Sequence, residues 1–180
     1  MLLRILAIAS LFLTMACVQN RTIGDRIDDS AAGLNLKSRL LFDREAKSGD
    51  IDMTIFEGRL LLTGTVRSEA DAEHIIGKAR TIPQVREVIS EIKVAPRTTF
   101  GQGTRDALID NRLEAALIAD TGVKAGNYRI LVSQGTVYLL GVAAGPGELQ
   151  RVTAQASTIE GVNEVVSHVI YLRDPRRPQK

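Results

Sequence analysis

The chain contains the stretch Glu57-Gly58-Arg59-Leu60-Leu61-Leu62-Thr63-Gly64 and, 77 residues later, the stretch Gln134-Gly135-Thr136-Val137-Tyr138-Leu139-Leu140-Gly141. In both, an apolar run lies between two glycines. A glycine just before such a run is typical of a tight hairpin turn, because glycine adopts positive φ without steric cost. Each stretch therefore predicts the turn and the second strand of a β-hairpin, so that the chain has two hairpins.

The repeat extends well beyond these two stretches. The same shift of 77 residues aligns the two halves of the chain without a gap. The matches are Leu36 with Leu113, Leu40 with Leu117, Asp43 with Asp120, Ala79 with Ala156, Ile82 with Ile159, Val85 with Val162, Glu87 with Glu164, Val88 with Val165 and Ser90 with Ser167. So many matches at one register indicate an internal repeat of one structural unit.

The periodicity of each copy predicts the order helix, strand, strand, helix, strand. In the second copy, Ile109, Leu113, Ala116 and Leu117 recur at helical spacing, and Gly122 ends that helix. Strands are expected at 128–132, 137–140 and 164–171, with a helix at 147–157; in the first copy the corresponding ranges are 51–55, 59–63, 87–94 and 69–80. A right-handed helical crossover makes the last strand parallel to the second. The prediction is an α+β fold of two tandem αββαβ modules, each a three-stranded mixed sheet covered by two helices.

The first residues are typical of a secretory signal. Arg4 is followed by an apolar run from Ile5 to Leu13 and then by small or neutral residues up to Ala16. The run is about half of the roughly 20 residues that a membrane-spanning helix needs. We therefore expect residues 1–16 to be a signal peptide that is removed.

Cys17 is the single cysteine of the chain, so it has no internal disulfide partner. Its position after Ala16 resembles the bacterial lipobox, in which the thiol is diacylated, although Thr14 stands where that pattern usually has Leu. The resemblance implies a lipid anchor at Cys17. The residue after the cysteine is Val18 and not the Asp that resembles the inner-membrane retention signal. The resemblance therefore implies that the protein is anchored at the periplasmic face of the outer membrane. The alternative is an ordinary signal that is cleaved nearby and leaves a free thiol.

Polar stretches and stretches rich in Pro and Gly mark the boundaries. We expect residues 17–28 to be the lipidated cysteine and a flexible tether, 29–95 the first module, 96–104 a linker and 105–172 the second module. Residues 173–180 are basic and contain two prolines, with no apolar side chain to bury. This composition predicts a disordered tail.

Composition and motifs argue against several classes of function. The net charge is only +2 and there is no Trp, so nucleic acid is not an expected partner. The two histidines, His74 and His168, have no metal-ligand spacing. No nucleophile or phosphate-loop motif is present. We therefore expect no metal, no cofactor and no catalytic site.

The whole pattern resembles the BON domain. The matching residues are Gly58, Gly64, Ala79, Ile82, Val85 and Val88 in the first copy and Gly135, Gly141, Ala156, Ile159, Val162 and Val165 in the second. The family usually has Gly before the first Val of the last segment; Gly161 fits and Gln84 departs. The resemblance covers about residues 29–172. It implies a tandem BON lipoprotein that supports outer-membrane integrity and binds anionic phospholipid.

A helical wheel of the segment that begins near Arg105 suggests a second apolar side, directed away from the core. The predicted membrane-contacting residues are Arg105, Leu108, Asn111, Arg112, Ile118 and Lys124. Apolar side chains would enter lipid while the basic ones meet anionic headgroups, and the basic tail could add to that attraction. The alternative is that this side is covered by the other module or by another copy of the chain.

Two hypotheses on function follow. The first is a non-catalytic envelope lipoprotein that binds anionic phospholipid and supports outer-membrane integrity. The second is a periplasmic protein-interaction module, a chaperone-like accessory to the assembly of outer-membrane proteins.

Overall fold

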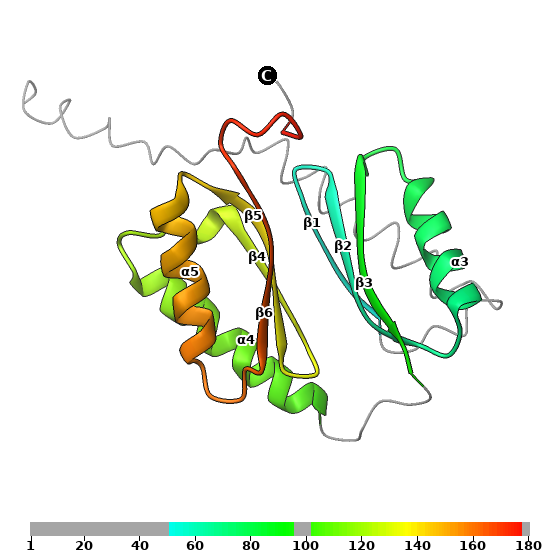
Figure 1. The fold of residues 1–180 in the computed structure, drawn as a ribbon, viewed down its shortest axis with the longest axis horizontal. Coiled ribbons are helices and arrows are strands. Elements are labelled where there is room, and N and C mark those ends of the chain that lie inside the picture. Colours follow the sequence, from blue (N-terminus) through cyan, green and yellow to red (C-terminus); the bar gives the residue numbers. More distant parts are fainter. Residues whose placement is uncertain (1–50, 96–101, 178–180) are drawn as a thin grey trace, which may run out of the picture.

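The computed structural model describes residues 51–95 and 102–177, which form two copies of one arrangement (Figure 1). Module 1 contains β1 (Ile51–Phe56), β2 (Arg59–Val66), α3 (Glu69–Arg80) and β3 (Glu87–Val94). Module 2 contains α4 (Gln102–Ala119), the 3-10 helix η3 (Ala125–Asn127), β4 (Tyr128–Ser133), β5 (Thr136–Ala143), α5 (Pro146–Thr158) and β6 (Glu164–Tyr171).

Each module has one three-stranded mixed sheet with its strands in chain order. The first two strands are antiparallel, and the third pairs in parallel with the second. The predicted α+β fold is therefore confirmed, and module 2 shows the complete αββαβ order. The helix predicted at the start of module 1 lies outside the described residues.

The described helices pack on one face of the sheet of their module. In module 1, Ile75 and Ala79 of α3 contact Leu60 and Leu62 of β2 in one buried cluster. In module 2, α4 and α5 together cover the sheet, and the core consists of Ile109, Leu113, Leu117, Val123, Tyr128, Val132, Val137, Leu139, Ala143, Val152 and Ala156. The predicted core stripe of α4 is thus largely buried; Ala116 is only half-buried.

The hairpin turn of module 2 is fixed from two sides. Gln134 and Gly135 both have positive φ, +54° and +75°, as the predicted turn requires. The carboxylate of Asp106, in the first turns of α4, accepts hydrogen bonds from the backbone N–H groups of Gln134 (2.8 Å) and Gly135 (3.0 Å). From the other side, the N–H of Asn163 donates to the carbonyl of Gly135. Asp106 therefore orients the hairpin from the N-terminal part of α4.

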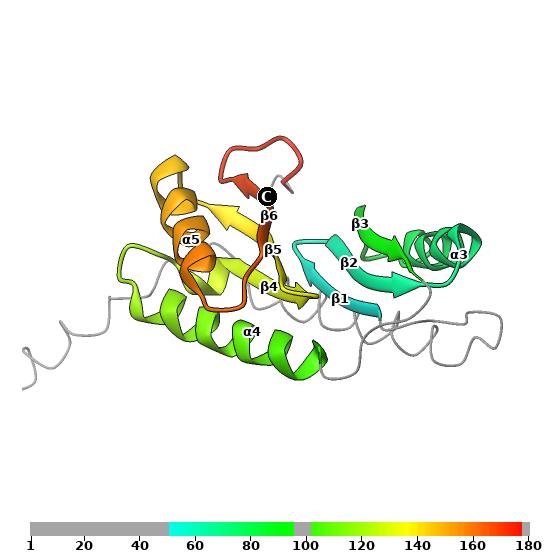
Figure 2. The ribbon, with the colours of Figure 1, turned by 60° about the horizontal axis from the view of Figure 1, so that its bottom comes forward.

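The two modules pack against each other through the sheet faces that carry no helix (Figures 1 and 2). Helix α3 lies on one outer side and α4 with α5 on the other, so the two sheets lie between them. A third buried cluster fills the contact between the sheets: Phe56, Leu61, Tyr138, Leu140, Val142 and Ile170. The central strands β2 and β5 are consequently buried on both faces.

The structure differs from the sequence prediction at two boundaries. Residues 102–104, expected in the linker, form the start of α4. Residues 173–177, expected in a disordered tail, form successive turns closed by the backbone hydrogen bonds Asp174 N–H to Tyr171 O and Arg177 N–H to Asp174 O. Residues 1–50, 96–101 and 178–180 lie outside the described part.

Candidate functional site

The outer face of α4 carries the predicted membrane-contacting side chains. Leu108 is 52% exposed and Ile118 is 68% exposed, although both are large and apolar. Arg105 and Arg112 are exposed on the same helix, and Arg112 makes only a 3.4 Å contact with the highly exposed Glu160. Asn111 folds back and donates a hydrogen bond to the carbonyl of Ala107. The structure thus brings five of the six predicted residues onto one helix.

Lys124 lies apart from these five residues. It follows the end of α4, in the loop that leads to η3. Its backbone N–H donates to the carboxylate of Glu148 in the first turn of α5. The loop is therefore tied to α5, and Lys124 does not belong to the helix that carries the other five residues.

An acidic rim that was not predicted from the sequence lies on one flank of this face. Asp110 and Glu114 line a hollow of about 300 Å³ between α4 and β4, together with Ile118 and Arg129. Burial, and then the charge of Glu114, raise the pKa of the Asp110 carboxyl above its ordinary value. The exposed apolar face of α4 is therefore bordered on one flank by the carboxylates of Asp110 and Glu114. The same helix also presents the basic side chains of Arg105 and Arg112 to solvent. The four-residue spacing of Asp110 and Glu114 was a visible signal, because such residues are neighbours on a helix.

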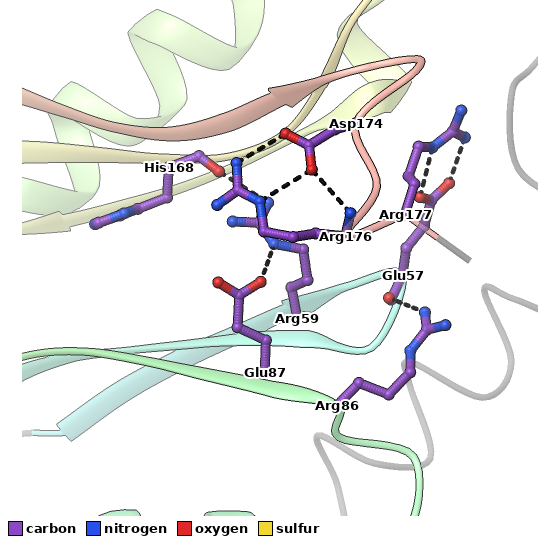
Figure 3. A network of polar contacts seen from close by, with 8 residues as sticks. All are labelled: Glu57, Arg59, Arg86, Glu87, His168, Asp174, Arg176 and Arg177. Atoms are coloured by element: carbon purple, nitrogen blue, oxygen red, sulfur yellow. Dashed lines mark hydrogen bonds and ion pairs between the residues drawn. The ribbon is translucent and has the colours of Figure 1, made fainter. Parts of the chain in front are cut away.

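A second polar cluster, the junction network, lies where the two modules meet (Figure 3). Its centre is Arg59 of β2, whose side chain is only 4% exposed. The Arg59 guanidinium donates to the carboxylate of Glu87 (2.6 Å) and to the backbone carbonyl of His168 (2.9 Å). Because His168 belongs to β6, a single buried arginine joins the two sheets. The network consists of Glu57, Arg59, Arg86, Glu87, His168, Asp174, Arg176 and Arg177.

The C-terminal segment belongs to the junction network. Arg177 donates two hydrogen bonds to the carboxylate of Glu57, at 2.8 and 2.7 Å. Glu57 lies in the β1–β2 turn, and its backbone carbonyl also accepts a hydrogen bond from Arg86. Residues 173–177 are ordered, against the prediction of a disordered tail, because Arg177 finds an acceptor in module 1 and Arg176 finds one in Asp174.

Asp174 shapes the turn that presents Arg177. Its carboxylate accepts hydrogen bonds from the guanidinium and the backbone N–H of Arg176. The side-chain hydrogen bonds from Arg176 lower the pKa of Asp174 to about 2. The turn is thus stabilised by a carboxylate that stays ionised at low pH.

In the part of the chain that the structure describes, three or more His, Cys, Asp or Glu residues nowhere gather into a possible metal site. None of the described helices is long and apolar enough to cross a bilayer. Cys17, the predicted anchor, lies outside the described residues.

In the described residues, two units, each with a three-stranded mixed sheet, are joined back to back through these sheets and define a tandem-domain protein. The chain belongs to the BON domain family, which it matches over residues 28–96 and 105–173.

Several proteins resemble this chain along most of its length. A protein of Anaplasma centrale described as an uncharacterized protein in the gshII 5′ region is 33% identical over 79% of this chain and 94% of its own length. The outer membrane lipoprotein DolP of Haemophilus influenzae is 28% identical over 84% and 79%. The osmotically-inducible protein Y of Escherichia coli is 26% identical over 79% and 72%.

Proposed function

We propose that this protein is a lipid-anchored envelope protein that binds anionic phospholipid through the outer face of α4 and thereby supports outer-membrane integrity. It works by binding and not by catalysis. The observation that carries the proposal is the exposure of Leu108 and Ile118 on a helix that also presents Arg105 and Arg112 to solvent. Similarity to a relative named as an outer membrane lipoprotein supports the location, together with the lipobox-like position of Cys17.

The energetics favour a reversible contact. Complete burial of Leu108 and Ile118 in lipid would contribute about 1.5–3 kcal/mol each, and less if they insert only in part. The arginines add an attraction to anionic headgroups that weakens with salt. The acidic rim of Asp110 and Glu114 opposes that attraction on one flank. A covalent acyl anchor would therefore hold the protein at the membrane while α4 makes the selective contact.

Within residues 51–95 and 102–177, this face is left exposed. The modules pack there through their sheets and not through the outer face of α4. The C-terminal turn lies on the opposite side of module 2 from α4 in both views (Figures 1 and 2). Arg177 is held by Glu57 there, so we assign lipid contact to α4 and not to the tail.

The test is flotation of the soluble chain, Val18 to Lys180, with vesicles of neutral or anionic phospholipid. We expect binding to anionic vesicles only, and loss of that binding in the double variant Leu108→Asp with Ile118→Asp. The matched control is Val94→Asp with Tyr171→Asp, which places the same charges on the two other exposed large apolar side chains of the described residues, at 43% and 41% exposure. Equal binding by both double variants would overturn the proposal. A change in oligomeric state of the α4 variant alone, with lipid binding intact, would instead assign this face to a protein partner.

A further inference from the structure

Glu91 and His168 occupy the same position in the two copies, 77 residues apart, and they contact each other directly. The ring nitrogen Nε2 of His168 lies 2.8 Å from Oε1 of Glu91. A carboxylate only accepts, so this nitrogen donates the hydrogen bond. In a pair of like units related by a two-fold axis, a residue meets its own counterpart only at that axis. The contact therefore lies at a pseudo-two-fold axis between the modules, consistent with the packing of β1 against its counterpart β4.

The two sheet faces that meet at this axis differ in character. Because side chains alternate along a strand, the residues that share the face of Leu61 and Tyr138 can be compared position by position. Module 1 has polar side chains at four positions where module 2 has apolar ones: Thr54 against Leu131, Thr63 against Leu140, Thr65 against Val142 and Lys93 against Ile170. At these four positions the face of module 2 is the more apolar one, although it also carries Arg129, Ser133 and His168.

When a mixed face packs against an apolar face, polar groups of the mixed face are buried opposite side chains that cannot form hydrogen bonds with them. The hydroxyl of Thr63 is buried at the junction without a hydrogen-bond partner in the described structure, which carries a free-energy cost. Module 2 could bury its apolar face without that cost against module 2 of another chain. Hydrophobic burial is non-directional, so it does not select the unlike module.

We propose that the Glu91–His168 contact specifies which modules pair, so that module 2 accepts module 1 and not a second module 2. When module 1 pairs with module 2, the ring N–H of His168 lies opposite the carboxylate of Glu91 at the axis, so that a donor meets an acceptor. Two copies of module 1 would place carboxylate against carboxylate, and two copies of module 2 would place imidazole against imidazole without an acidic partner. The sheet face of module 2 is accordingly a docking surface for a BON-type sheet face with a carboxylate at the axial position, and module 1 of the same chain is its occupant.

A charge-swap cycle in the soluble chain tests this proposal. We expect His168→Glu to lower the midpoint of urea unfolding and to raise the radius of gyration in solution scattering, because two carboxylates then face each other with no donor. Glu91→His should do so to a smaller extent. The double variant, with Glu91→His and His168→Glu together, restores the pair in reverse and should recover most of both losses.

Ser90 and Ser167 supply the matched controls. They precede Glu91 and His168, are exposed, and point to the other face of each sheet. Ser167→Glu and Ser90→His should leave the midpoint and the radius close to those of the unmodified chain. The proposal is overturned if the swapped double variant is no more stable than His168→Glu alone. It is also overturned if His168→Glu behaves like Ser167→Glu, because the axial position would then not discriminate between partners.

Discussion

Arg177 donates two hydrogen bonds to the carboxylate of Glu57, which lies 120 residues earlier in the chain. The side chain of Glu57 is 2% exposed and that of Arg177 is 16% exposed, so the pair is largely removed from water. A residue that follows the last strand of module 2 is therefore a partner of the first hairpin of module 1. Together with Arg59, it makes the two modules one unit.

Removal of Arg177 should destabilise the protein. Arg177→Ala leaves the buried carboxylate of Glu57 without its bidentate partner, and breaking such a pair costs about 3–5 kcal/mol when both groups are fully buried. Arg177 is partly exposed, so we expect a loss of about 1–3 kcal/mol in the free energy of urea unfolding. Arg173→Ala removes the same charge from an exposed position of the same segment and should change stability little. Equal effects of the two variants would contradict the role of Arg177.

Asp106 should be required for the hairpin turn of module 2. Asp106→Asn replaces one of two carboxylate oxygens by an N–H₂ group, which cannot accept from the turn. One of the N–H groups of Gln134 and Gly135 then loses its acceptor, and we expect a loss of about 1–3 kcal/mol in unfolding free energy. Amide hydrogen exchange should quicken at these two residues. An unchanged exchange rate there would show that the cap is not needed.

Substitution of Asp110 should affect stability in the opposite direction from substitution of Asp106. The pKa of Asp110 is raised by burial and by Glu114, so its ionised form is disfavoured in the folded state. Because the pKa of Asp110 is higher in the folded protein than in the unfolded chain, its protonation stabilises the fold at pH values below the unfolded-state pKa. This stabilisation is lost as the pH rises through the folded-state pKa. Asp110→Asn should therefore stabilise the protein at neutral pH, whereas Asp106→Asn destabilises it.

Protonation of Asp110 should also affect membrane contact. As the pH falls, Asp110 becomes neutral before an ordinary Asp, and the acidic rim of the α4 face weakens. Binding to anionic vesicles should increase over that range, and Asp110→Asn should bind more strongly with a flatter pH profile. Flotation measured as a function of pH checks this, and a steeper profile in the variant would contradict it.

Cys17 should carry the lipid. Cys17→Ser removes the thiol that acylation requires, so we expect a precursor that no longer incorporates labelled palmitate in cells. The unmodified chain should label and should fractionate with the outer membrane. Labelling that persists in the variant, or that never occurs in the unmodified chain, would rule out the anchor.

The strands and helices were predictable because their determinants are local. Gly135 indicated a turn because it precedes an apolar run and glycine adopts positive φ without steric cost. Ile109, Leu113 and Leu117 indicated a buried stripe because they recur at helical spacing. The predicted ranges 69–80, 87–94 and 164–171 agree with α3, β3 and β6.

A contact between the modules was considered only as a cover for the outer side of the helix near Arg105; packing through the two sheets was not predicted, although part of it left a signal. Leu60-Leu61-Leu62 and Val137-Tyr138-Leu139-Leu140 are unbroken apolar runs, which indicate strands buried on both faces. The partner of that second face depends on tertiary packing. The partner of Arg177 is likewise non-local: a basic segment with two prolines has a composition typical of disorder, and nothing in its own sequence points to Glu57.

The unequal polarity of the two sheet faces has a consequence for the order of synthesis. Domains generally fold as units, with the N-terminal one first. The copy that emerges first is the one whose face carries Thr63, Thr65 and Lys93 beside Phe56 and Leu61, so it exposes fewer apolar side chains to water before the second copy is made. The more apolar face of module 2, which carries Tyr138, Leu140 and Ile170, is completed only after module 1, which covers it, has been synthesised. An exchange of the two copies along the gene would reverse this sequence of events and expose the nascent chain to aggregation, even though every contact of the finished protein could still form.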